Sequence, residues 1–326
     1  MNANFTRRRL NVLCCAIACA AGVTHAQERY PSKPIRFLAG AVPGGATDIL
    51  ARAIGQRLAD NLHQQVVIDN RPGANQIIAA EITAKALPDG YTIIMVPSGF
   101  TINPAMYKKL PYDPVRDFTP IALVADVPNV LVVNPTLPAR SVKDFIALLR
   151  AKPGQMSYGS SGIGSPSHLC AELFKLVTKI DFIHVPYKGN GQTMIELMGG
   201  QIQLSFPSIP ASVNFIKAGR MIALGVTTRG RASALPEVPT IAEAGVAGYE
   251  VSGWYGVLAP PNVPRALVAR LNGEINRILN DPETSKTLSQ QGADPLPASP
   301  EHFAATIKSD LTKWAKVVAA AGIKPQ

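Results

Sequence analysis

Two segments rich in glycine and hydroxyl side chains contain the residue types best suited to bind an anion. Residues 43–48 read PGGATD and residues 160–165 read SSGIGS, and each follows an apolar run typical of a strand and precedes a helical pattern. The first backbone N–H groups of a helix are unpaired and carry partial positive charge, so such a segment can hold a carboxylate or a phosphate. The alternative for either segment is a tight turn in which glycine only supplies unusual dihedral angles.

The first segment supplies Gly44, Gly45, Thr47 and Asp48 as candidate ligand-binding residues. We expect Gly45 to need a positive φ and to let the ligand approach the backbone. Asp48 has an alternative role as a first-turn acid that stabilises its own helix. Because no Lys-Ser/Thr pair follows the glycines and the spacing G-x-G-x-x-G is absent, a P-loop and a dinucleotide-binding fingerprint are excluded at this segment.

The second segment is the more specific signal, because its three serines and two glycines offer both hydroxyls and amides to a carboxylate. Ser165 and Pro166 read as an N-cap followed by proline at the first helical position. The candidate ligand-binding residues here are Ser160, Ser161, Gly164, Ser165 and His168. His168 lies one turn into the helix, where packing or capping is its alternative role.

Three more positions follow predicted strands and complete the candidate site. Lys188 would offer a cation to a ligand carboxylate, although exposure to solvent is the common alternative for a lysine. Ser98 closes the strand predicted at 91–96, and Pro207 follows the strand predicted at 204–206. Ligands of open α/β sheets bind at the carboxyl ends of strands, so we expect these positions to meet there.

Residues suited to metal or redox chemistry are sparse. His63, His184 and His302 lack the i, i+4 spacing of a metal-binding helix. Three of the four cysteines fall within the first 26 residues, which leaves Cys170 alone in the remainder. We therefore expect no metal site, no cofactor and no internal disulfide, with Cys170 buried in the core.

The first 26 residues are typical of a secretory signal peptide. Arg7, Arg8 and Arg9 precede an uncharged apolar stretch at 10–23 that is too short to span a bilayer, and Ala26 closes a set of small residues suited to cleavage. We expect cleavage after Ala26 and a periplasmic location, reached by either Sec or twin-arginine export.

Composition places the rest of the chain among globular proteins. Hydrophobic residues make up 47% of the 326 residues and charged residues 17%, which is enough apolar surface for a sizeable core. Lys plus Arg exceed Asp plus Glu by 32 to 22, but the excess is spread along the chain. Neither a nucleic-acid-binding arm nor a membrane-embedded protein is therefore expected.

Strands and helices alternate along the chain in a way that predicts an α/β fold. Strands are expected at 34–39, 66–69, 91–96, 182–185, 204–206, 222–226 and 256–259, and helices at 50–62, 76–86, 166–178, 192–197, 265–279 and 302–320, with a further helix starting at Ser141. The β-α-β-α-β opening predicts a parallel sheet with right-handed crossovers. A Pro-rich stretch at 103–120 precedes a crossover near Asp126, after which a second α/β unit begins.

Short motifs spread over essentially the whole mature chain resemble those of the Bug family, the periplasmic solute-binding proteins of tripartite tricarboxylate transporters. They are, in order, YPSKPI from Tyr30, PGGATD from Pro43, NRPGA from Asn70, LPDGYT from Leu87, YGSSGIGS from Tyr158, HVPYKG from His184, LPEVPT from Leu235 and GWYG from Gly253. The resemblance implies a two-lobed Venus-flytrap fold, type II-like, with the ligand cleft between the lobes. It also implies a binding protein rather than an enzyme, which holds a small carboxylate on the segments at 43–48 and 160–165 and delivers it to membrane subunits of the transporter.

We expect residues 27–125 together with 226–326 to form the first lobe and residues 126–225 to form the second. The lobes are expected to close around the ligand, and the protein is expected to be a monomer that binds no nucleic acid. Part of the family carries an acidic residue where this chain has Pro207, so a ligand with an ammonium group would lack its partner here.

Two other functions are compatible with these residues. The same closed lobes would serve a sensor that docks on a receptor, and the sequence does not separate transport from signalling. A secreted serine hydrolase would need a pair such as Ser161 and His168, but the spacing G-x-S-x-G and a third, orienting acid are absent. The identity of the carboxylate is left open.

Overall fold

The computed structural model describes residues 30–251, 253–320, 322–323 and 325, and the predicted signal peptide lies outside them. Contacts divide the chain into the units Met1–Ser32 and Lys33–Gln326, and the architecture below belongs to the second unit. Among the described helices, none combines the length and the apolar composition needed to cross a membrane.

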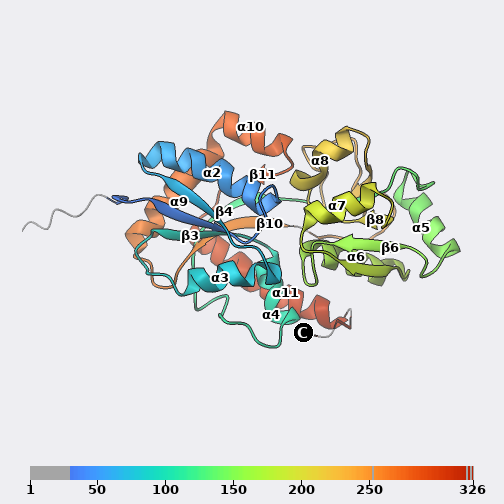
Figure 1. Ribbon diagram of the computed structural model, residues 1–326, viewed down its shortest axis with the longest axis horizontal. Helices are drawn as coiled ribbons and strands as arrows, with labels where there is room; N and C mark the ends of the chain where they lie inside the picture. Colours follow the sequence, from blue (N-terminus) through green and yellow to red (C-terminus); the bar gives the residue numbers. More distant parts are fainter. Residues whose placement is uncertain (1–29, 252, 321, 324, 326) are drawn as a thin grey trace, which may run out of the picture. The chain divides into compact units, whose positions relative to one another are not determined.

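The unit Lys33–Gln326 contains two mixed sheets (Figure 1). The first sheet has the strand order β11-β4-β10-β3-β1-β2. Its strands are β1 (Ile35–Ala39), β2 (Val66–Asn70), β3 (Thr92–Pro97), β4 (Thr119–Asp126), β10 (Trp254–Ala259) and β11 (Asp294–Pro295). Strand β1 pairs in parallel with β2 and β3, which confirms the predicted parallel opening, whereas β10 runs antiparallel to β3 and β4.

The middle of the chain builds the second sheet, with the order β7-β6-β8-β5-β9. Its strands are β5 (Val130–Val133), β6 (Ser157–Ser160), β7 (Ile183–Pro186), β8 (Leu204–Ser205) and β9 (Ile222–Val226). Strand β6 is parallel to β7, with Ser160 in register with Pro186. The segment that follows β6 therefore begins beside the segment that follows β7, and Lys188 belongs to the latter.

The described helices fall close to the predicted ranges, with three additions. They are α2 (Ala46–Leu62), α3 (Ile77–Ala84), α4 (Gly99–Met106), α5 (Val142–Ala151), α6 (Pro166–Thr178), α7 (Asn190–Met198), α8 (Ile209–Lys217), α9 (Arg265–Asn280), α10 (Pro282–Gln290) and α11 (Pro300–Ala320), preceded at α3 by the short 3₁₀ turn η1 (Ala74–Gln76). The predicted N-cap Ser165 is confirmed at α6. Helices α4, α8 and α10 are not predicted from the sequence, and α4 contains Pro104, which ordinarily ends a helix.

Helix α2 illustrates how the apolar pattern orients the segment at 43–48. Leu50, Ile54 and Leu58 recur every four residues and are fully buried, and α2 contacts β1, β2 and β3 of the first sheet. This stripe determines which face of the helix meets the sheet. The N-terminus of α2 therefore lies at the carboxyl end of β1, where the segment at 43–48 connects them.

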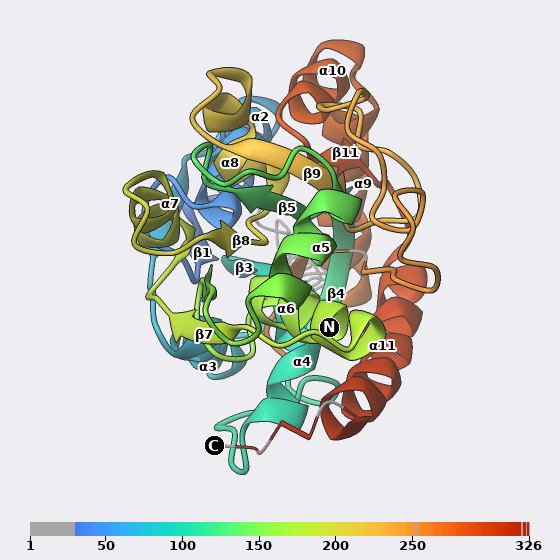
Figure 2. The same ribbon diagram turned by 90° about the vertical axis from the view of Figure 1, so that its right-hand side faces the viewer.

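Helices α4 and α11 join the apolar cores of the two sheets. At one end of α11, Phe303 and Ile307 pack with side chains of the first sheet. At the other end, Trp314 packs in the core of the second sheet, and Met106 of α4 is buried in the same cluster. Both helices, α4 and α11, are labelled in Figure 2. The predicted limits of the two lobes stay a prediction, because these two helices contribute to the cores of both sheets.

Candidate functional site

A cavity of about 660 Å³ is lined by loops from both sheets. From the first sheet come residues 40–42, 45–47, 72–73, 75–76, 97–98, Tyr107, Gly253 and Tyr255, and from the second sheet and its crossover come Val127, Asn129, 161–163, 165–167, 186–191 and Ser208. Within this described lining, Lys188 is the one cationic side chain, and no aspartate or glutamate is present. The wall therefore favours a negatively charged ligand.

Five helices begin at the wall of this cavity. The N-cap residues Gly45 of α2, Ser98 of α4, Ser165 of α6, Gly189 of α7 and Ser208 of α8 all line it. Each helix N-terminus carries partial positive charge and unpaired amides. The sequence predicts the termini of α2 and α6 as the binding pair, and the structure adds three more.

Asp48 holds the first segment in place from behind the cavity. Its carboxylate is buried and accepts hydrogen bonds from the Gly44 amide (2.9 Å), Arg52 Nε (3.0 Å) and Asn70 Nδ2 (2.9 Å). Burial acts to raise the pKa of Asp48, but the hydrogen bonds from Arg52, Gly44 and Asn70 hold it below its ordinary value. The Asp48 carboxylate is therefore ionised, and donors of the protein itself engage it.

The glycines of the first segment differ in backbone conformation. Gly44 has a φ of +82°, whereas Gly45 is extended with a φ of −75°, so the expectation of a positive φ at Gly45 is wrong. Gly44 makes the turn, and Gly45 is the N-cap that lines the cavity. The backbone amides of the next two residues, Ala46 and Thr47, have no hydrogen-bond acceptor in the described part of the chain. Both residues line the cavity.

The second segment presents a chain of three serine hydroxyls to the cavity. Ser167 Oγ accepts a hydrogen bond from the Ser161 amide (2.9 Å) and lies 3.1 Å from Ser161 Oγ and 3.0 Å from Ser165 Oγ. Ser165 Oγ also caps α6 by accepting the His168 amide (3.3 Å). The three hydroxyls can redirect their protons along this chain, so they can donate to an anion without moving.

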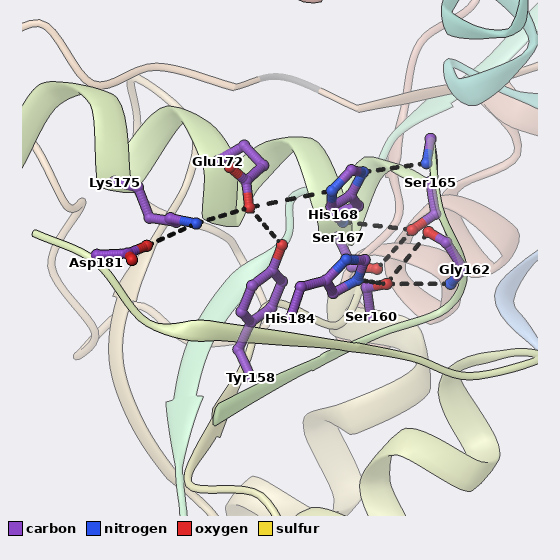
Figure 3. A network of polar contacts seen from close by, with 11 residues as sticks. Tyr158, Ser160, Gly162, Ser165, Ser167, His168, Glu172, Lys175, Asp181 and His184 are labelled. Atoms are coloured by element: carbon purple, nitrogen blue, oxygen red, sulfur yellow. Dashed lines mark hydrogen bonds and ion pairs between the residues drawn. The ribbon is translucent and has the colours of Figure 1, made fainter. Parts of the chain in front are cut away.

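A buried layer lies behind these serines, and it contains the remaining predicted residues of the segment (Figure 3). Ser160 Oγ is 2.7 Å from His184 Nε2, and the Gly164 amide donates to His168 Nδ1 (3.1 Å). Burial lowers the pKa of both histidines to about 4. The Ser161–His168 pair of a hydrolase is absent from the contacts of these residues, and Ser160, which does meet a histidine, is fully buried outside the cavity lining.

The other predicted positions also divide into residues that line the cavity and residues that lie outside its lining. Ser98 and Lys188 line the cavity, and Lys188 is exposed. Pro207 lies outside the lining, where its carbonyl accepts the Val130 amide (3.0 Å), and the next residue, Ser208, lines the wall instead.

Half of the predicted site residues line the cavity and half support it. Those that line it are Gly45, Thr47, Ser98, Ser161, Ser165 and Lys188. Those that lie outside the described lining are Gly44, Asp48, Ser160, Gly164, His168 and Pro207. Ligand contact by any of them stays a prediction.

Several lining residues are not found by the sequence reasoning. Gln76 Nε2 donates to Thr47 Oγ1 (3.1 Å), and Tyr255, whose pKa burial raises to about 12, hydrogen-bonds the same threonine. Asn75 and Gln76 both have positive φ, at 49° and 69°. A run of two non-glycine residues in this region is rare, and no sequence signal used above detects it.

Metal and thiol chemistry find no support in the described residues. They contain no group of three or more His, Cys, Asp or Glu side chains placed to hold a metal ion. Cys170 is fully buried, as predicted, and burial raises the pKa of its thiol to about 12. A thiol of that kind is unreactive at neutral pH.

Known proteins share both this sequence and this architecture. Residues 50–323 match the family model described as "Tripartite tricarboxylate transporter family receptor" (TctC). The structure of R. palustris Rpa4515 with adipate is similar over 91% of this chain and 100% of that chain, with 38% identity and a TM-score of 0.89.

Two further solved structures are similar over nearly the same span. The periplasmic binding protein BugD matches 91% of this chain and 100% of its own, with 32% identity and a TM-score of 0.86. MatC (Rpa3494) from Rhodopseudomonas palustris with bound malate matches 89% of this chain and 100% of its own, with 30% identity and a TM-score of 0.82. These similarities confirm the predicted two-lobed α/β fold of periplasmic binding proteins.

Proposed function

This chain belongs to the tripartite tricarboxylate transporter receptors, as a periplasmic solute-binding protein of the Bug type, and on that premise we propose that its cavity captures a small carboxylate for delivery to the membrane subunits of such a transporter. The observation that carries the proposal is the composition of the cavity wall. Five helix N-termini and one lysine converge there, and the described lining has no carboxylate.

Backbone amides and hydroxyls hold the carboxylate in this proposal. The free amides of Ala46 and Thr47 approach it from the first segment, and the hydroxyls of Ser161 and Ser165 approach it from the second. Hydrogen bonds to a charged acceptor are each worth roughly 1.5–3 kcal/mol. Such a site needs no arginine, and the described lining contains none.

The relatives and the volume of the cavity favour a dicarboxylate. Adipate and malate, which two of the similar proteins bind, each carry two carboxylates. A cavity of about 660 Å³ accommodates a molecule of that size together with bridging water. The second carboxylate then lies toward Lys188 or toward the N-termini of α7 and α8.

Calorimetric titration of adipate and malate into the mature protein tests the proposal. Ser161→Ala should weaken binding by about 0.5–1.5 kcal/mol, because one hydroxyl donor is lost. Gly45→Val should weaken it more, since a branched side chain blocks the approach to the amides of α2. Lys188→Met should have a modest effect, and Lys217→Met, an exposed lysine on α8 outside the lining, is the matched control.

Two results would contradict the proposal in different ways. Loss of all binding in Lys188→Met, with Ser161→Ala and Gly45→Val unchanged, would mean that a lysine rather than the amides holds the ligand. Failure of the wild type to bind adipate, malate or any of a panel of mono- and dicarboxylates would contradict the proposal that the ligand is a carboxylate.

Export and oligomeric state belong to the same proposal. The exported protein should begin near Gln27 and run as a monomer in size-exclusion chromatography with light scattering. N-terminal sequencing that found Met1 retained, or a lipid on Cys19, would contradict it.

Closure of the lobes around the ligand is also proposed. Asn75 Nδ2 donates to the Gly164 carbonyl (3.2 Å), which joins η1 on the first sheet to the segment after β6 on the second. Because α4 and α11 pack in the core of the second sheet, opening is limited to the opposite side of the cavity. Small-angle scattering should show a small compaction with ligand, and expansion would count against closure.

A further inference from the structure

The segment at 160–165 is held from behind by two histidines, His168, which is buried, and His184, which is half-buried (Figure 3). The Gly164 amide donates to His168 Nδ1 (3.1 Å). The Gly162 amide donates to Ser160 Oγ (3.2 Å), and that hydroxyl lies 2.7 Å from His184 Nε2. Both glycine amides of the segment therefore depend on acceptors that a histidine supplies or orders.

The two imidazole rings are fixed by stacking. His168 and His184 are parallel to within 12°, with centroids 4.3 Å apart, and His184 stacks in turn on Tyr158 at 4.6 Å and 15°. The Tyr158 hydroxyl donates to Glu172 Oε1 (2.7 Å), which anchors the outer ring. A shift of either imidazole would therefore disturb the two glycine amides that fix the segment at 160–165.

Hydrogen bonding determines where the proton of His168 lies. Because Nδ1 accepts the Gly164 amide, the neutral ring carries its proton on Nε2, which lies 4.0 Å from Glu172 Oε1. Protonation of Nδ1 would place a second donor against that amide. It would also bring positive charge against the stacked ring of His184 and toward Lys175.

The titratable groups around the pair come from α6, from β6 and from the connection before β7. Glu172 and Lys175 lie on α6, Tyr158 lies on β6, and Asp181 precedes β7 and pairs with Lys175 (2.9 Å). Glu172 favours a cation on His184, and Lys175 disfavours a cation on either ring. The hydrogen bond from the Gly164 amide to His168 Nδ1 requires that Nδ1 carry no proton. The contacts of this layer are therefore those of a neutral His168.

We propose that His168 and His184 are positioning residues for anion binding, which hold the amides and hydroxyls of the segment at 160–165 in their binding geometry through an unprotonated His168 Nδ1 and an ordered Ser160. This proposal rests on the proposed carboxylate-binding function. Neither histidine touches the cavity, so each acts through the loop that it supports.

Paired substitutions separate the acceptor from the bulk of the ring. The Oδ1 of His168→Asn falls near the position of Nδ1 and keeps the acceptor, whereas His168→Leu keeps only volume. His184→Gln, whose amide can donate to or accept from Ser160 Oγ, and His184→Leu separate hydrogen bonding from volume at Nε2. His302→Asn, at an exposed histidine on α11, is the control.

Calorimetry with adipate and malate provides the first readout. The leucine variants should bind at least about tenfold more weakly than wild type, and His168→Asn and His184→Gln should recover most of that loss. The proposal is overturned if the leucine variants bind as tightly as wild type does. It is also overturned if His168→Asn and His184→Gln bind as weakly as the leucine variants although their melting temperatures equal that of wild type.

Nuclear magnetic resonance provides a second readout that needs no ligand. Long-range ¹H–¹⁵N spectra should show His168 as the neutral Nε2–H tautomer, and the Gly164 amide should exchange slowly in wild type and His168→Asn but fast in His168→Leu. A wild-type Nδ1–H tautomer would overturn the positioning role. Absence of adipate and malate binding with this tautomer and exchange pattern intact would instead count against the proposed function alone.

Discussion

The loops that precede α2 and α6 present similar amides to the cavity, yet charged groups hold the first loop and neutral groups hold the second. Asp48, an ionised carboxylate, ties the first loop to Arg52 and to the Gly44 amide. Neutral imidazole and hydroxyl groups centred on His168 tie the second loop from a buried layer. Two loops of one cavity wall are thus supported in different ways, one by an ionised carboxylate that persists in mild acid and one by neutral imidazoles that acid protonates.

Acid should separate the two loops most strongly. The pKa of His168 and that of His184 are lowered to about 4 by burial, so the stability that they contribute is complete above their ordinary value near 6.5 and is lost as the pH falls toward 4. The pKa of Asp48 is held low despite burial, so its contribution persists until the pH falls below its ordinary value of 3.8.

Amide hydrogen exchange measured between pH 6.5 and pH 4 tests this difference between the two loops. After correction for intrinsic rates, exchange at Gly164 should accelerate by up to about tenfold per pH unit, whereas exchange at Gly44 should stay constant. Equal acceleration at both glycines would mean that the loops respond to a global loss of stability, and the contrast would be wrong.

Removing the charge of Asp48 should weaken the first loop alone. Asp48→Asn leaves Arg52 without its ionic partner and gives the Gly44 and Asn70 donors a weaker acceptor at a buried side chain, so the free energy of unfolding should fall by about 2 kcal/mol in urea denaturation. Asp60→Asn, at an exposed acid on the same helix, is the matched control and should change it by less than about 0.5 kcal/mol. Similar losses for the two variants would contradict the anchoring role.

The turn glycines should differ because only one of them faces a neighbour. Gly44 and Gly164 have φ of +82° and +75°, but a Cβ on Gly44 would meet open space, whereas one on Gly164 would lie 3.0 Å from Met106 Cγ. Gly44→Ala should cost about 1 kcal/mol of stability from backbone strain, and Gly164→Ala about 2 kcal/mol. Equal costs in thermal denaturation would show that Met106 yields without penalty.

The smallest effects should differ in their response to salt. Ser165→Ala removes the N-cap of α6 and should cost about 1 kcal/mol at any ionic strength. Arg52 is 53% exposed, so Arg52→Met should cost less than about 1 kcal/mol, and that cost should shrink as salt is raised to about 0.5 M. A salt-dependent loss in Ser165→Ala would contradict the neutral support of the second loop.

The sequence predicts the framework and both loops because their signals are local. The pair Ser165-Pro166 predicts the start of α6 correctly, and the glycine-rich segments lie where the strand-to-helix pattern places them. Helix α4 is not predicted because Pro104 reads as an end. The expected positive φ belongs to Gly44 rather than Gly45, since the pattern G-G alone does not tell which of the two turns.

The supports of the second loop could not be predicted, because one depends on the register of two strands and the other on the direction in which a turn aims one amide. His184 reaches Ser160 only because β6 and β7 pair in parallel with Tyr158 opposite His184. His168 accepts from Gly164 only because that glycine turns its amide back toward the helix, at a φ of +75°. Residue types near a loop identify candidates, and the folded register decides which of them line the cavity and which hold the loop.

The helices shared between the two sheets bear on how the molecule melts. Separating the sheets would expose Met106 and Trp314, which are buried in the core of the second sheet although α4 and α11 also pack on the first. Neither half would then keep a complete apolar core, so heat should unfold both in one cooperative transition. Proteolytic loss of α11 would accordingly unfold both sheets together, and damage near the carboxyl end of the chain would reach a loop of the cavity wall that lies far from it in sequence.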